Sequence, residues 1–311
     1  MFHLYNDNRS AIVYNSYMDN YLSLNRFFTK TTFDKIIDGD YLSFYCALKN
    51  KYTNGTEKSN REVIDLFYLT LSKTHRNEYI YKNSLLYELV LSKHKIDSTK
   101  VLTEFNLGKC VADFVTINGK IVAYEIKTEL DVLDRIDQQI EEYYKCVPYV
   151  CILTCEKHLD RLLKKYGDSA VGIYLFNSKN KILTIKEPSA NYCSIEKELV
   201  FSLLRKSEYK YIIEKNHKKI PITTQVKYYS ECMRVFCELD LDTIMKDTIH
   251  VLKKRFKTIN ELFYKVPKSL KMLVYQSNYT NSDYEKMFYF LNSKSTMLNK
   301  EAKDVLSIFK R

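Results

Sequence analysis

The chain has 311 residues, with 49 lysine and arginine side chains against 38 aspartate and glutamate, a formal net charge of +11. The N-terminal stretch lacks a secretory h-region and there is no run of 18 apolar residues, which argues against the secreted and membrane-spanning classes. Eight scattered cysteines without a Cys-x-x-Cys pair are expected as reduced thiols in a cytoplasmic protein of two or three domains. The excess of positive charge favours a polyanionic partner such as DNA and no membrane.

Two helices are predicted in the first third of the chain. Residues 76–91 place apolar side chains close to a helical repeat and lack glycine and proline, and a further helix is expected at residues 61–71. An irregular stretch rich in tyrosine and asparagine precedes them. We therefore expect a mostly helical N-terminal region, residues 1–73, ahead of the main core.

Short apolar runs then predict the strands of a sheet. The first run has Glu104 in its middle and ends at a Gly108-Lys109 turn. Glu104 is either a further acid of a site or a charge facing the sheet edge. Strands separated by helices indicate a mixed sheet with helices on its faces. Besides the hairpin described next, we predict strands at residues 101–107, 147–153, 171–176 and 181–186.

The hairpin between Asp113 and Lys127 carries the most informative pattern. Glu125 and Lys127 are two residues apart on a strand, so they point to the same face. A two-residue turn at the Asn-Gly pair would set Asp113 on the opposite face. We therefore predict a three-residue loop with Gly119 in the left-handed conformation and a bulge beside it, which would bring Asp113 to the face of Glu125.

These residue types suit phosphoryl chemistry. Two carboxylates are hard oxygen ligands for Mg²⁺ or Mn²⁺, and such an ion polarises a phosphoryl oxygen and lowers the pKa of a bound water. Lys127 would face the negative charge of the transition state or orient the water. An acid-x-lysine triplet is common on solvated strands, but residues 121–126 are almost continuously apolar, as in a buried strand. Charges in a buried strand favour a site.

These residues resemble the PD-(D/E)XK nuclease superfamily, and residues 76–154 are similar to a bacterial family of small stand-alone members without an assigned role. Ala112 stands where the superfamily name has proline. The resemblance implies an α/β restriction-endonuclease-like core, a mixed central sheet flanked by helices, with a helical C-terminal region. The matching motifs are Arg76-Asn-Glu78-Tyr-Ile-Tyr-Lys82-Asn83, Thr103-Glu104-Phe105, Cys110-Val-Ala-Asp113, Tyr124-Glu125-Ile126-Lys127, Asp131-Val-Leu-Asp134-Arg135 and Gln138-Gln139-Ile-Glu-Glu-Tyr143.

The resemblance also implies that the first core helix supplies a carboxylate to the metal. We favour Glu78 over Glu88, since ten residues correspond to about 280° around a helix and both cannot face one site. The alternative for Glu78 is a helix-start glutamate that stabilises the dipole. The backbone carbonyl of Ile126 is a further ligand, and Lys82 and Glu104 are auxiliary residues.

An amphipathic helix is predicted to follow the acid-x-lysine strand, with apolar residues from Val132 to Val147. Gln139 and Tyr143 are four residues apart and share a face. In several branches of the superfamily such a pair holds the DNA end or the lysine, although a surface glutamine and a half-buried tyrosine are the plainer interpretation. An iron–sulfur cluster, as some members carry, would need Cys46, Cys193, Cys232 and Cys237, whose spacing fits poorly.

Basic side chains gather in the last third, where proline breaks separate helical segments. The aromatic residues among them are candidates for stacking on bases, although aromatics at helical spacing more often belong to a core. We expect nucleic-acid contacts from Lys218, Lys219, Lys253, Lys254, Arg255 and Lys257.

The sequence thus predicts a nuclease-like core at residues 74–188 and a helical accessory domain at residues 189–311. The expected function is a Mg²⁺-dependent deoxyribonuclease, with defence against foreign DNA or mobile-element maintenance as its context by analogy. Two alternatives remain open: a catalytically silent DNA-binding or assembly subunit, and an RNA-directed nuclease. A double-strand cut would require a homodimer, a partner protein or two successive nicks.

Overall fold

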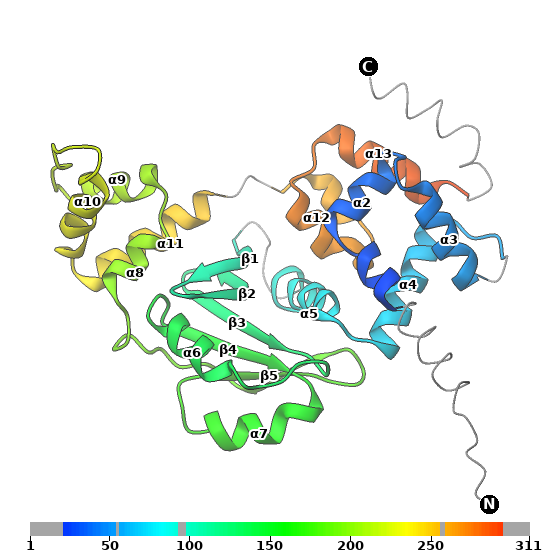
Figure 1. Ribbon diagram of the computed structural model, residues 1–311, viewed down its shortest axis with the longest axis horizontal. Coiled ribbons are helices and arrows are strands. Elements are labelled where there is room, and N and C mark those ends of the chain that lie inside the picture. Colours follow the sequence, from blue (N-terminus) through cyan, green and yellow to red (C-terminus); the bar gives the residue numbers. More distant parts are fainter. Residues whose placement is uncertain (1–20, 54–55, 93–97, 256–258, 295–311) are drawn as a thin grey trace, which may run out of the picture. The chain divides into compact units, whose positions relative to one another are not determined.

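The computed structural model describes residues 21–53, 56–92, 98–255 and 259–294 (Figure 1). The chain forms two compact units, one made of Met1–Asn83 with Asn260–Arg311 and the other of Ser84–Ile259. We call them the terminal unit and the sheet unit. The helices expected as one C-terminal region are therefore divided between both units. Within the described ranges, no helix combines the length and the hydrophobicity needed to cross a bilayer.

One six-stranded mixed sheet forms the centre of the sheet unit, as predicted. Its strands lie side by side in sequence order, with β3–β4 and β4–β5 parallel and the other pairs antiparallel. β4 starts directly after Pro148, which lacks the N–H that a ladder needs. The strands are β1 (Lys100–Leu107), β2 (Cys110–Ile117), β3 (Ile121–Lys127), β4 (Tyr149–Thr154), β5 (Gly172–Phe176) and β6 (Ile182–Lys186).

The helix expected over residues 76–91 begins at Glu78 as α5 (Glu78–Leu85) and ends as the π-helix η1 (Leu86–Leu91). The boundary between the two units falls inside this helical segment. α6 (Ile136–Tyr144) is shorter than predicted. Val132, which was expected on its apolar face, lies before the helix and is 70% exposed. α7 (Glu156–Tyr166), which packs next to β5, was not predicted.

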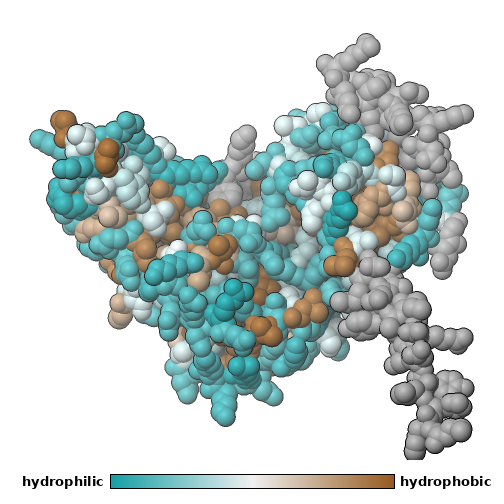
Figure 2. All heavy atoms as spheres, in the orientation of Figure 1, coloured by the Kyte–Doolittle hydropathy of each residue, from teal (hydrophilic) through white to brown (hydrophobic). Residues whose placement is uncertain are grey.

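Four helices complete the sheet unit and share its hydrophobic core. α6 contributes Ile136, Ile140 and Tyr143 to a cluster that includes sheet residues such as Val115 and residues such as Phe201 of the later helices. On the surface, the face shown in Figure 2 is mainly hydrophilic, with small separate hydrophobic patches. The four helices are α8 (Lys197–Ser202), α9 (Lys206–Lys215), α10 (Tyr228–Cys237) and α11 (Leu241–Lys254).

The terminal unit is helical and joins the two ends of the chain. The helix predicted at residues 61–71 is confirmed as α4 (Asn60–Thr74). Asn60 donates to the Phe290 carbonyl at 2.8 Å and accepts from the Tyr45 hydroxyl at 2.7 Å, inside a core of aromatic rings. The elements are α2 (Lys30–Ile37), α3 (Leu42–Thr53), α4 (Asn60–Thr74), α5, η2 (Glu261–Lys265), η3 (Lys268–Leu270), α12 (Lys271–Ser277) and α13 (Asn281–Asn292).

We predict that Gly108→Ala destabilises the protein more than Gly119→Ala. Both glycines have left-handed φ angles, +61° and +70°, so alanine costs about 1–2 kcal/mol at either position. A Cβ at Gly108 would also overlap the Glu142 carboxylate, which accepts from the Lys109 amide, whereas Gly119 has nothing within 4 Å. Urea denaturation of both variants measures the difference. Equal losses would show that the contact with Glu142 contributes nothing.

Lys271 gives the terminal unit a pH-dependent stability. Its ammonium is buried and donates to the carbonyls of Phe263 at 2.6 Å and Tyr264 at 3.1 Å. Burial lowers the pKa of Lys271 to about 8 from an ordinary value of 10.5. Between these values the unfolded chain binds a proton that the folded chain lacks, so this group's contribution to the unfolding free energy rises with pH, by about 3 kcal/mol.

The measurement is the unfolding free energy of wild type and Lys271→Met at several pH values. The stability of the variant relative to wild type should fall by about 3 kcal/mol from near pH 7.5 to near pH 10.5, because the variant lacks the titrating group. A difference that stays constant with pH would contradict the prediction.

Candidate functional site

β2 and β3 separate at one end of their hairpin. The pairing runs from Ile117 opposite Ile121 to Phe114 opposite Tyr124. Beyond this point β2 continues along β1 and β3 continues along β4. We call the opening the fork; residues 110–113 of β2 and residues 125–127 of β3 are its walls.

The hairpin has the predicted register. Residues 118–120 form a three-residue loop, in which Gly119 has a φ of +70° and the Asn118 amide donates to the Lys120 carbonyl at 3.0 Å. Carried one residue beyond the Phe114–Tyr124 pair, this register sets Asp113 opposite Glu125. The predicted loop and left-handed glycine are confirmed.

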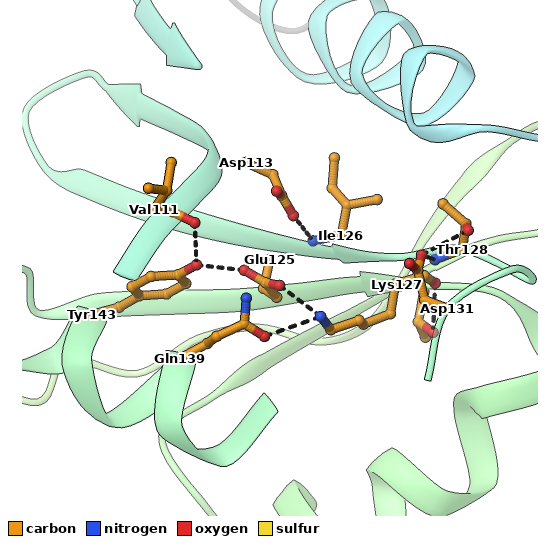
Figure 3. Close-up of polar contacts among 10 residues, drawn as sticks. Val111, Asp113, Glu125, Ile126, Lys127, Thr128, Asp131, Gln139 and Tyr143 are labelled. Atoms are coloured by element: carbon orange, nitrogen blue, oxygen red, sulfur yellow. Dashed lines mark hydrogen bonds and ion pairs between the residues drawn. The ribbon is translucent and has the colours of Figure 1, made fainter. Parts of the chain in front are cut away.

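The side chain of Asp113 nevertheless does not lie beside Glu125. Its Oδ2 accepts from the Ile126 amide at 2.7 Å, across the fork. Figure 3 shows Asp113 on the side of β3 to which the Ile126 side chain points, whereas Glu125 and Lys127 extend toward α6. The predicted common face of the two carboxylates is therefore wrong, although the register behind it is right.

An irregularity opposite Asp113 explains the difference. The β1–β2 ladder skips Glu104 and Asp113, and Glu104 has a φ of +50°, which residues other than glycine rarely adopt. Ala112 and Val115, three residues apart, both belong to the core cluster, which strict alternation would not allow. A local break of this kind redirects a side chain. It also brings carboxylate oxygens of Glu104 and Asp113 within 4.8 Å of each other.

Glu125 and Lys127 form a buried ion pair at the other wall of the fork. Glu125 is 2% exposed, and Lys127 Nζ donates to its Oε1 at 2.8 Å. Lys127 also donates to Gln139 Oε1 at 3.0 Å (Figure 3). The predicted common face of Glu125 and Lys127 is confirmed, and Gln139 from α6 reaches the lysine.

Tyr143 connects the two walls of the fork. Its hydroxyl lies 2.5 Å from Glu125 Oε2 and 2.8 Å from the Val111 carbonyl, so its single proton serves both acceptors. Burial and the negative charge of Glu125 raise the pKa of Tyr143 well above its ordinary value. The hydroxyl therefore remains a donor at any physiological pH.

A buried ion pair contributes less to the stability of a core than its contacts suggest. A buried ion pair loses hydration that its mutual attraction only partly restores, and apolar replacements are often as stable. Here each oxygen of Glu125 has a donor from Lys127 or Tyr143, so the pair is fully supported. A buried charge with this many hydrogen-bond partners favours a functional site over a purely structural role.

A turn after β3 contributes a residue to which sequence reasoning gave no role. Asp131 Oδ2 accepts from both the amide and the hydroxyl of Thr128, each at 2.7 Å, and fixes the chain where it leaves the sheet. A threonine followed three residues later by aspartate was the available signal. His158 lies 3.1 Å from the Thr128 carbonyl and holds the same turn from α7.

The two predicted helix acids, Glu78 and Glu88, belong to different compact units. Glu78 begins α5 in the terminal unit and forms an ion pair with Lys82 on the next turn. The alternative residue, Glu88, belongs to the sheet unit, where its carboxylate accepts from the Ile182 amide at 3.2 Å. In the described part of the chain, no group of three or more candidate metal ligands includes a cysteine.

The predicted basic contacts differ in their surroundings. Arg255 is held by Glu208, with its Nε 2.6 Å from Oε1, and Lys218 pairs with Glu238 at 3.1 Å. Lys219 and Lys254 are exposed and Lys253 is half-buried, whereas Lys257 lies outside the described residues.

Comparison with known proteins matches the part of the chain that contains the fork to a phage protein family. The family described as bacteriophage P4 protein cII matches residues 71–283, more than half of the chain. The chain belongs to this family. Protein cII of Enterobacteria phage P4 is 28% identical over 189 residues, which cover 60% of this chain and 67% of that protein. No solved structure matches. The cII family region contains all of the fork residues.

We predict that Tyr143→Phe destabilises this cII family protein by about 1–3 kcal/mol, because a buried oxygen of Glu125 loses its donor. Tyr144→Phe is the matched control on the same helix, since the Tyr144 hydroxyl is buried without a hydrogen-bond partner among the described residues. Its removal should be neutral or stabilising. Thermal denaturation compares the two, and similar losses would remove the support for a special role of the Tyr143 hydroxyl.

Proposed function

We propose that this cII family protein is a Mg²⁺- or Mn²⁺-dependent nuclease that hydrolyses DNA phosphodiester bonds on a restriction-endonuclease-like core. The observation that carries the proposal is the buried Glu125–Lys127 pair, held by Gln139 and Tyr143 at an opening between two strands. The Lys127 ammonium is fixed by hydrogen bonds to two side chains, Glu125 and Gln139. Positioned charge of this kind is what phosphoryl transfer requires.

The acids at the fork have the donor chemistry of a hard divalent cation. Asp113 and Glu104 bring carboxylate oxygens within 4.8 Å of each other, and oxygen ligands are those that Mg²⁺ prefers. In this proposal Asp113, Glu104 and the Ile126 carbonyl would hold the ion. Glu125 extends to the other side of β3 and would join them only by leaving Lys127 or Tyr143 and turning toward Asp113. A bound cation would supply charge neutralisation and an acidified water. The assignment of Glu78 to the metal remains a prediction from the resemblance.

Lys127 would act on the substrate through its remaining hydrogen-bond donor. An ammonium has three N–H groups, and within the described chain Glu125 and Gln139 use two of them. The third would donate to a phosphate oxygen or to the attacking water. Gln139 and Glu125 would hold the Nζ in place while charge develops on the phosphoryl group.

Charge and kinship support the choice of DNA and a biological context. The net charge of +11 favours a phosphate backbone as partner. Similarity to a phage protein favours mobile-element maintenance over defence. A homodimer or partner protein would be needed for a concerted double-strand cut.

One observation favours a second candidate, the catalytically silent DNA-binding or assembly subunit. Both oxygens of Glu125 already have partners within the protein, Lys127 and Tyr143. A network that stays closed in the presence of a cation would be a structural device on a superfamily-like fold. This candidate predicts DNA binding without cleavage.

The test is cleavage of supercoiled plasmid, linear duplex, single-stranded DNA and RNA with Mg²⁺, Mn²⁺ or EDTA. We compare wild type with Asp113→Asn and Lys127→Ala, and use Lys120→Ala, an exposed lysine of the same hairpin, as the matched control. Loss of a positioned group should lower the rate about 100- to 1000-fold. DNA binding in EDTA should persist in all variants, and circular dichroism checks their folding.

Metal-dependent cutting by wild type and Lys120→Ala alone would support the nuclease. Cutting of RNA only would favour the RNA-directed alternative. Retained DNA binding without cutting under any condition would favour the silent subunit, and full activity of Lys127→Ala would refute the assigned site.

A further inference from the structure

The helical part of the sheet unit carries a pocket that the proposed nuclease chemistry does not use. It lies between α9 and α11, has a volume of about 340 Å³ and is lined by charged and aromatic side chains. This volume falls within the range of small-ligand sites, about 300–1,000 Å³. The lining residues that matter here are Arg205, Glu208, Tyr211, Lys254 and Arg255.

The charges around the pocket leave an excess of positive charge toward solvent. Glu208 is occupied internally, because Arg255 Nε donates to its Oε1 at 2.6 Å and the Arg205 amide donates to its Oε2 at 2.7 Å. Burial raises the pKa of Glu208, but these hydrogen bonds outweigh it and the net shift is downward. Arg255 also donates to the Leu203 carbonyl. The side chains of Arg205 and Lys254 are exposed.

An aromatic surface lies beside these cations. Tyr211 is 39% exposed, and its ring stacks with the His250 ring, with centroids 6.0 Å apart and planes 21° apart. Lys254 Nζ lies 5.3 Å from the Tyr211 centroid. The next residue on each helix, Ile212 on α9 and Val251 on α11, is buried in the core. The backbone positions of Tyr211 and Lys254 are therefore fixed by packed helices before any ligand binds.

We infer that this pocket, together with the Tyr211–His250 stack, is a binding site for single-stranded nucleic acid. Arg205 and Lys254 would contact the phosphates and Tyr211 would stack on a base. A base in a duplex keeps its faces stacked on its neighbours, so an exposed aromatic ring gains a partner only from an unpaired strand. The inference rests on the proposed function only in assuming a nucleic-acid substrate; it names the strand form and does not require cleavage.

Fluorescence anisotropy tests the site, with EDTA present so that no cleavage occurs. The probes are a short fluorescein-labelled oligothymidylate and a duplex of the same length. Tyr211→Ala should weaken single-strand binding about 5- to 100-fold, the effect of one lost stacking contact. Tyr289→Ala is the matched control, because Tyr289 is 40% exposed and lies in the terminal unit, and it should bind as wild type does.

The salt dependence separates the cation from the ring. Lys254→Gln should lower the slope of log affinity against log salt by about 0.7, the value for one phosphate contact on a single strand. Lys164→Gln, an exposed lysine of α7, should leave the slope unchanged, and so should Tyr211→Ala. No single-strand binding by wild type, equal losses for Tyr211→Ala and Tyr289→Ala, or preference for the duplex would overturn the inference.

The fork and the pocket can fail independently in these assays. If the wild type binds single strands through Tyr211 but cuts nothing with any metal, the single-strand site is supported and the nuclease proposal is refuted. If the wild type cuts DNA with Mg²⁺ and Tyr211→Ala binds and cuts as wild type does, the nuclease proposal is supported and the single-strand site is refuted.

Discussion

The separation of β2 from β3 beyond Phe114 and Tyr124 is the constraint on which the site depends. Two strands that part inside a sheet leave backbone groups without ladder partners, and buried backbone groups must be satisfied in another way. Asp113 accepts from the Ile126 amide, and the Tyr143 hydroxyl donates toward the Val111 carbonyl. The side chains of Asp113 and Tyr143 thus replace hydrogen bonds of the ladder. The shape of the site and the stability of the sheet therefore depend on the same atoms.

This coupling explains why α6 must be placed so accurately. Tyr143 bonds to both walls of the fork, and Gln139, one turn earlier, fixes Lys127. Asp137 joins α6 to α7 through Lys165 and Tyr166, and burial and the negative charge of Asp137 raise the pKa of the Tyr166 hydroxyl. A shift of α6 would break several of these bonds at once. An ion pair held by Gln139 and Tyr143 of α6 would lose little side-chain entropy if a ligand bound there, which is the advantage of preorganisation.

Much of the fold could be predicted from the sequence because it rests on local signals. The Asn-Gly pair predicted the tight loop at Gly119, and strand alternation predicted the pairing of Glu125 with Lys127. The three-residue length of the loop was predicted for a different reason, a common face of Asp113 and Glu125 that the structure does not form. The orientation of Asp113 could not be predicted, because it depends on a break in the neighbouring β1–β2 ladder at Glu104. Nor could the two compact units, because long-range contacts such as that of Asn60 with Phe290 decide them.

The later helices belong physically to the sheet unit, and this bears on how a substrate would be held. Phe201 and Leu252 lie in the same buried cluster as Ala123 and Ile152 of the sheet, so α8 and α11 complete the core that supports the fork. A strand bound at Tyr211 would therefore be bound by the unit that carries Lys127, without relying on the terminal unit. In the proposed function one fork per chain would act on one strand at a time, and a binding site for unpaired nucleic acid in the same unit would suit such a reaction.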